Sequence, residues 1–292
     1  MVSILIGCVI AGMIAINGRL SALYGILGAT VVIHLVGSVF ALGVIKLRKQ
    51  KLNLNPTVPL WLLSGGMIGV CTTVCNNAAY GKISMTSIVA LGLFGQTLTS
   101  LAIDHFGLFH MPKYKFNKAQ FLGLTFAIIG MAVMLDDMGD AVLTAIVLSL
   151  TAGMSVVLSR TVNAGLSNRI GALQGSFINH LVGLPITIVI LLLFGRGEPI
   201  FTGFTISSQV WIYLGGVLGV MVVLLFNLTV PKIQALNLTL LTFIGQVFTG
   251  ILIDILTKQG YSSSTFYGGI LIAIGMLGNI LIAHKCSARV QM

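Results

Sequence analysis

Ten long runs of apolar residues, separated by short polar segments, are the feature that most restricts how this chain can fold. The runs cover about residues 2–18, 27–45, 58–78, 84–104, 119–135, 142–161, 172–194, 209–230, 235–256 and 266–284. Each is close to the roughly 20 residues that an α-helix needs to cross a bilayer. Only 8% of the 292 residues are charged, against about 25% in soluble domains. We therefore expect an all-α integral membrane protein with ten transmembrane helices.

Lysine and arginine residues divide unequally between the two sides of these ten spans. With the N-terminus inside, 12 of the 16 basic residues lie on the inner side, Arg160 among them. The other four are Arg19, Lys82, Arg196 and Lys258. Because short cytoplasmic loops carry an excess of Lys and Arg, we expect a multi-pass plasma-membrane protein with both termini in the cytoplasm. The net charge of +10 is thus a topology signal, and we expect no nucleic-acid partner.

The second half of the sequence repeats the first. At an offset of 146, residues 17–37 align with 163–183, and nine of the 21 positions are identical. At an offset of 150, the residues Trp61, Asn77, Gln96 and Asp104 align with Trp211, Asn227, Gln246 and Asp254. Shared hydrophobicity cannot align residues of these types. We expect two five-helix repeats, in residues 1–138 and 139–292.

An odd number of spans in each repeat means that the two halves cross the membrane in opposite directions. Inverted repeats of this kind are the architecture of many secondary transporters, whose substrate site lies near the midplane between the repeats. The prediction is therefore a transporter that moves a small metabolite by alternating access. A passive channel or facilitator, and a membrane scaffold subunit that transports nothing, are the alternatives. The sequence does not distinguish a monomer from a homodimer.

Gln96 and Gln246 lie mid-way along two of the matched spans, and each precedes a threonine, Thr99 or Thr249, by three residues. That spacing puts the glutamine and the threonine on one helix face. A pair of amides at the midplane can bind substrate without carrying charge. It can equally form an interhelical hydrogen bond. These four residues are our predicted substrate-binding residues.

Two further pairs of polar residues recur in both halves. His34 and His180 lie inside spans, where they are either hydrogen-bonded core groups or proton-coupling groups, because histidine titrates near physiological pH. Asp104 and Asp254 lie at the C-terminal ends of their spans, as gates or as interfacial carboxylates. A carboxylate there opposes the helix dipole, so we expect each to have a compensating partner.

Lys82 and Lys232 open the two glutamine-containing spans. They are either contacts for an anion or ordinary lysines that extend to the membrane interface. No acidic residue lies inside a span away from its end, which argues against a proton/multidrug-cation exchanger. We therefore favour a neutral or anionic substrate.

Signatures of enzymes, metal sites and cofactor sites are missing from the sequence. It contains no HExxH, GxSxG, CxxC or Walker motif. Cys71 and Cys75 lie inside an apolar run, where we interpret them as small core residues. The prediction is a protein without enzymatic activity, cofactor or metal, whose partners are the lipid bilayer and a small-molecule substrate.

Two stretches resemble the bacterial YdcZ-like family of the drug/metabolite transporter superfamily. One runs from Gly95-Gln96 to Asp104-His105-Phe106-Gly107 and looks like a hallmark of that family, and the other is residues 17–37. The resemblance covers essentially the whole chain. Many members look like single five-helix halves that pair as antiparallel dimers, and this chain looks like two such halves fused. The resemblance implies a plasma-membrane transporter of a small solute, with its site between the halves.

The chain departs from the small multidrug branch of that superfamily. That branch relies on a glutamate in its first helix, and this sequence has residues 14–17, Ile-Ala-Ile-Asn, in the corresponding region. The drug-export mechanism of that branch is therefore not carried over to this chain.

Overall fold

The protein is mainly helical in the part that the computed structural model describes. That part comprises residues 2–52, 58–111, 113, 125–126, 128–130, 132–133, 140–203, 205–257, 263–264, 267–268, 270–271, 274–275 and 278. Its main helices are α1 (Val2–Tyr24), α2 (Ile26–Leu47), α3 (Ser64–Ala79), α4 (Met85–Phe106), α6 (Asp140–Ile170), α7 (Ala172–Phe194), α9 (Leu214–Thr229) and α10 (Ala235–Thr257). A short helix α8 spans Pro199–Thr202. The shorter 3₁₀ helices are η1 (Leu60–Leu63), η2 (Leu108–His110), η3 (Val210–Tyr213) and η4 (Val230–Lys232).

Seven helices of the described residues are long and apolar enough to cross a membrane. They are α1, α2, α4, α6, α7, the continuous segment Val210–Lys232 and α10. This confirms a multi-spanning all-α membrane protein. The predicted span at 58–78 corresponds to η1 and α3, and α3 itself has only 16 residues. The predicted spans at 119–135 and 266–284 lie largely outside the described residues.

Two helices extend well beyond the predicted spans. The predicted spans end at residues 18 and 161, but α1 continues to Tyr24 and α6 to Ile170. The polar residues are compatible with a helix here because protein covers them: Asn17 is 4% exposed, and Asn163 is 1% exposed. Counting Arg160 with the residues on the inner side was wrong. It lies within α6 and is 3% exposed, which leaves 11 basic residues against four for the orientation.

Matching glycines connect the first two helices of each half. Gly25 separates α1 from α2 with φ of 84°, and Gly171 separates α6 from α7 with φ of 100°. A side chain at either position would strain the backbone, since positive φ is costly for residues with a Cβ. The two turns are 146 residues apart, as the sequence repeat requires.

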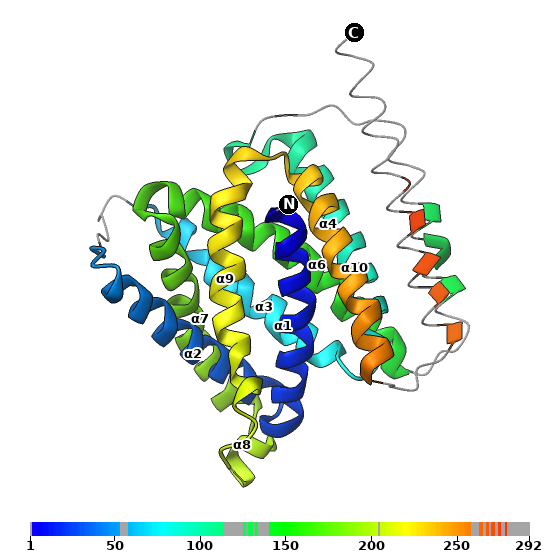
Figure 1. Ribbon diagram of the computed structural model, residues 1–292, viewed down its shortest axis with the longest axis horizontal. Coiled ribbons are helices and arrows are strands. Elements are labelled where there is room, and N and C mark those ends of the chain that lie inside the picture. Colours follow the sequence, from blue (N-terminus) through cyan, green and yellow to red (C-terminus); the bar gives the residue numbers. More distant parts are fainter. Residues whose placement is uncertain are drawn as a thin grey trace.

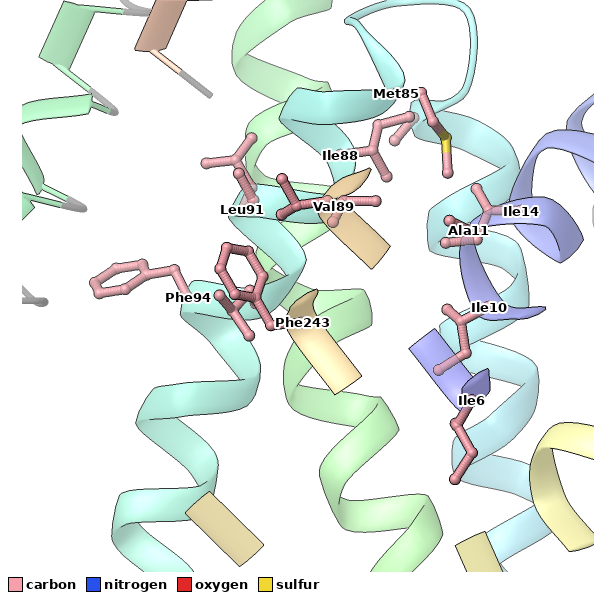
Figure 2. Close-up of a cluster of buried hydrophobic side chains, with 14 of the residues drawn as sticks. Ile6, Ile10, Ala11, Ile14, Met85, Ile88, Val89, Leu91, Phe94 and Phe243 are labelled. Carbon is pink, nitrogen blue, oxygen red and sulfur yellow. The ribbon is translucent and has the colours of Figure 1, made fainter. Parts of the chain in front are cut away.

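Helix packing brings the two halves together along their length. In Figure 1, α10 runs beside α4, while α1 and α9 cross the middle of the molecule and α2 lies near α7. The largest apolar cluster lies where α1, α4 and α10 meet. Figure 2 shows Ile6 and Ile10 of α1, Ile88 and Phe94 of α4, and Phe243 of α10 in this cluster.

Glycines allow the closest of these approaches, and they do so in matched pairs. A Cβ added at Gly7 of α1 would overlap the carbonyl oxygen of Thr242 in α10. A Cβ added at Gly153 of α6 would overlap the carbonyl oxygen of Gly92 in α4. The α1–α10 contact and the α6–α4 contact are therefore built from equivalent residues.

Candidate functional site

A cavity lies between the two halves, and both halves line it. About 110 Å³ of it is open to the centres of water molecules, and one water needs about 10–15 Å³ on this measure. A small metabolite therefore fits. The lining residues are Ile10, Met13, Asn17, Ile33, His34, Gly69, Thr72, Thr73, Asn76, Val156, Ser159, Arg160, Asn163, Asn179, His180, Gly219, Val222, Val223, Phe226 and Asn227.

The two predicted coupling histidines meet in this cavity. The ring centroids of His34 and His180 are 5.7 Å apart. His34 Nδ1 lies 2.9 Å from the carbonyl oxygen of Thr30, and His180 Nδ1 lies 3.0 Å from that of Ser176. A carbonyl only accepts, so each Nδ1 carries a proton and each Nε2 is left as the atom that can gain one.

Each histidine also packs on a glycine of the opposite half. A Cβ added at Gly183 would lie 2.6 Å from His34 Nε2, and one added at Gly37 would lie 2.9 Å from His180 Nε2. The pair thus fixes how closely α2 and α7 approach each other. Whether it also couples transport to protons remains a prediction.

Asn17 and Asn163 make a second pair of reciprocal contacts. A Cβ added at Gly215 of α9 would overlap Asn17 Oδ1, and a Cβ added at Gly65 of α3 would overlap Asn163 Oδ1. Neither oxygen has a hydrogen-bond partner. Asn163 Nδ2 donates to Asn179 Oδ1 at 2.7 Å and to Ser159 Oγ at 3.1 Å. The second half therefore has a side-chain network around its asparagine.

Equivalent positions in the two halves give the cavity one polar and one apolar wall. The polar wall comprises Thr72, Thr73 and Asn76 of α3, Ser159, Arg160 and Asn163 of α6, and Asn179 of α7. The apolar wall comprises Ile10 and Met13 of α1, Ile33 of α2, and Val222, Val223 and Phe226 of α9. Each wall has exceptions: Val156 of α6 lies on the polar side, and Asn17, His34 and Asn227 lie on the apolar side. The helices α3, α6 and α7 contact one another, and so do α1, α2 and α9. A solute in this cavity thus meets one side that is mostly polar and one that is mostly apolar.

Arg160 is the charged residue of the cavity lining, and none of the described lining residues is acidic. Its Nη2 donates to Thr239 Oγ1 at 2.5 Å and to the carbonyl oxygen of Ala235 at 3.1 Å. Its guanidinium carbon lies 5.3 Å from the centre of the Phe226 ring, within cation–π range. Arg160 Nη1 is buried without a hydrogen-bond partner.

Asp104 and Asp254 have the compensating partners that the sequence predicted. Asp254 accepts hydrogen bonds from the backbone N–H groups of Met85 and Thr86, both at 2.8 Å, at the start of α4. Asp104 accepts one from the N–H of Leu236, at 3.0 Å, at the start of α10. Each carboxylate thus lies at the C-terminal end of its own helix but caps the N-terminus of the other, where the dipole favours negative charge. Their role as gates remains a prediction.

The predicted substrate-binding residues are not among those that line this cavity. Gln96 and Gln246 are buried, and Gln96 Oε1 and Gln246 Nε2 have no hydrogen-bond partner. Thr99 donates to the carbonyl oxygen of Gly95 in its own helix, and Thr249 is half-buried. A role for these four residues in binding remains a prediction.

Lys82 and Lys232 are exposed and also lie outside the lining of the cavity. The proposed anion contact at these lysines remains a prediction. Among the described residues, no group of three or more His, Cys, Asp or Glu is placed to hold a metal ion.

Sequence reasoning missed the polar wall. Asn163 was visible as part of the repeat, but Ser159 and Asn179 have apolar equivalents, Met13 and Ile33, and alignment of the halves passes over them. An arginine near the end of an apolar run was the available signal, because ionisable residues inside a span mark functional sites. Counting Arg160 with the residues on the inner side hides this signal.

A family model described as "Putative inner membrane exporter, YdcZ" matches the chain twice, over residues 1–133 and 144–286. The chain belongs to this family. The resemblance noted in the sequence is thereby confirmed, and the protein is a multi-pass inner-membrane transporter of a small molecule. A solved structure titled only "Crystal structure of protein" has a TM-score of 0.63 and 14% identity, covering 97% of this chain and 98% of its own. At that identity the likeness shows the fold alone. No curated protein matches the chain.

Proposed function

We propose that this YdcZ-family protein is a secondary transporter that moves a small metabolite across the inner membrane by alternating access. Its ten helices form two inverted five-helix repeats, with both termini in the cytoplasm and the substrate site near the midplane. The observation that carries this proposal is the cavity itself, since residues of both halves line it. The family is described as one of exporters, so export is the direction to test first.

Reciprocal contacts support the inverted arrangement. His34 lies on Gly183 as His180 lies on Gly37, and Asn17 lies on Gly215 as Asn163 lies on Gly65. Contacts that exchange the two halves in this way are expected of a pseudo-two-fold axis. Two such halves can exchange conformations, and the exchange would expose the cavity to each side in turn.

Filling the cavity tests the proposal. Gly69 lines the cavity, and the nearest atoms to a Cβ added there are 3.5 Å away or more. Gly69→Phe therefore places a ring in the cavity without a backbone clash at Cβ. We expect it to lose transport in proteoliposomes while still folding, as measured by thermal unfolding in detergent. Gly43→Phe is the matched control, because nothing lies within 4 Å of a Cβ at Gly43.

Counterflow separates the proposal from its alternatives. Proteoliposomes preloaded with unlabelled amino acids, sugars or carboxylates are assayed for uptake of the same labelled compound. A carrier shows transient accumulation above equilibrium, whereas a passive facilitator shows flux without it. A scaffold shows neither. Absence of counterflow across the panel, or transport that survives in Gly69→Phe, would contradict the proposal.

A further inference from the structure

We propose that the transported solute is a small organic monocarboxylate, whose carboxylate binds the Arg160 guanidinium and whose apolar part lies against the apolar wall. This inference rests on the proposed function and names the substrate class of the same cavity. Four observations carry it: the unpartnered guanidinium nitrogen, the way the rest of that side chain is held, the nearby acid, and the chemistry of the two walls.

The first observation is an unused donor at a buried charge. Arg160 is 3% exposed and lines the cavity, and its Nη1 has no hydrogen-bond partner. A buried donor without a hydrogen-bond partner has lost its hydrogen bonds to water and gained none in the protein. The free-energy cost of this loss is larger for a charged group than for a neutral one. Guanidinium groups pair with carboxylates more strongly than with neutral acceptors. An anion in the cavity would provide the hydrogen-bond acceptor that the Arg160 guanidinium lacks.

The second observation is that the guanidinium is already held in place. Its Nη2 is occupied by Thr239 and Ala235 of α10, with Ser100 of α4 at 3.4 Å. The ring of Phe226 lies against its face. Because the side chain is fixed before the solute arrives, little conformational entropy is lost on binding.

The third observation concerns Asp104, the acidic group that interacts electrostatically with Arg160. Asp104 Oδ2 accepts from the N–H of Leu236, and Oδ1 has no hydrogen-bond partner. The carboxylate therefore lies against the N-terminus of α10, whose partial positive charge offsets its own. This arrangement lowers the cost of burying the guanidinium but leaves Nη1 without a hydrogen-bond partner. With one cation in the lining, the cavity suits a single negative charge.

The fourth observation is the position of Arg160 between the two walls. It belongs to the polar wall by its helix, α6, yet its guanidinium lies over Phe226 of the apolar wall. A carboxylate bound there has Val222 and Val223 on the preceding turn of α9. Arg160 is the one Lys or Arg among the described lining residues, so we expect the solute to have one charged end only.

The test compares acids with matched neutral compounds on the wild-type protein. Thermal unfolding of the purified protein is followed with butyrate, hexanoate, benzoate or phenylacetate, and with their primary amides. We expect the acids to stabilise the protein and the amides to stabilise it far less, with the longer or aromatic acids binding best. Equal stabilisation by acids and amides overturns the inference. This comparison needs no variant that has to fold.

Arg160→Gln tests the residue itself. Loss of one charge-assisted hydrogen bond should weaken binding of the best acid roughly tenfold to a hundredfold. Arg169→Gln removes the same charge from an exposed position of the same helix and should bind like the wild type. Should Arg160→Gln fail to fold, the double variant with Asp104→Asn removes both charges. Wild-type affinity in a folded Arg160 variant overturns the inference.

Counterflow distinguishes failure of this inference from failure of the proposed function. Counterflow of amino acids or sugars that is sensitive to Gly69→Phe, without any effect of the acids, leaves the transporter proposal standing and overturns the monocarboxylate assignment. Absence of counterflow for every compound overturns both. Counterflow of the acids that is lost in Arg160→Gln and kept in Arg169→Gln supports both.

Discussion

The two halves of this protein hold each other through matched residues and line their shared cavity with unmatched ones. Glycine meets backbone at equivalent places, and each histidine packs on the other half's glycine. In the cavity, Met13 and Ser159 are equivalent by sequence, and so are Val223 and Thr73. Helix packing is thus conserved by the repeat, whereas the chemistry of the cavity arises where the repeat has diverged. A comparison of equivalent substitutions tests this division.

The largest effect is expected at the matched glycines. Gly7→Ala and Gly153→Ala each place a methyl group on a carbonyl oxygen of the facing helix, and backbone cannot move aside cheaply. Each should destabilise the protein by about 3 kcal/mol or more, at the upper end for overpacking. Thermal unfolding in detergent measures this, and we expect the two losses to be similar.

Gly12→Ala is the control in the same helix as Gly7, because nothing lies within 4 Å of its added Cβ. It should be neutral or stabilise the helix by roughly 0.5–1 kcal/mol. A large loss at Gly7 with none at Gly153 would show that the two contacts are not equivalent.

An intermediate effect is expected at the aspartates, where the halves differ. Asp254 accepts from two backbone N–H groups and from the Thr86 hydroxyl at 2.5 Å, so Asp254→Asn should cost about 2 kcal/mol in lost charge-assisted bonds. Asp104 accepts from one N–H but lies near Arg160. We expect the cost of Asp104→Asn to depend on that arginine.

A double-mutant cycle measures the dependence. Arg160→Gln should reduce the cost of Asp104→Asn by about 1–2 kcal/mol, since close charges couple by that order, and should leave the cost of Asp254→Asn unchanged. Equal coupling of both aspartates to Arg160 would contradict the expectation that only Asp104 depends on this arginine.

The smallest effect is expected from exchanging wall chemistry. Thr73→Val and Val223→Thr each convert one wall residue to the type found at the equivalent position. Thr73 donates to the carbonyl oxygen of Gly69 in its own helix, so stability should change by less than about 1 kcal/mol. Binding of hexanoate should weaken a few-fold in Val223→Thr, because a hydroxyl replaces a methyl group, and should change little in Thr73→Val. Titration of thermal stability with hexanoate measures both effects. Weaker binding in Thr73→Val than in Val223→Thr would show that the apolar part of the solute does not lie against the apolar wall.

The sequence predicted only part of the candidate site, and it missed the polar wall. The repeat drew attention to His34 and His180, and the structure places both in the cavity. The same reasoning favoured Gln96 and Gln246, which are buried away from its lining. The repeat shows that the same residue type occurs at equivalent positions of both halves. It does not show whether that side chain faces a cavity or a neighbouring helix. Residues used once, such as Asn179, carry no such signal.

The sequence alone indicated the membrane environment, most of the described helices and the pairing of equivalent positions, because the length of an apolar run and a sequence repeat can be recognised without knowing the fold. It also determined that Asp104 and Asp254 require partners, since a carboxylate at a helix C-terminus opposes the dipole. Only the tertiary structure decided that each partner is the other half's helix N-terminus. It alone placed Arg160 at a cavity with one nitrogen unused, because burial and direction depend on helices that are distant along the chain.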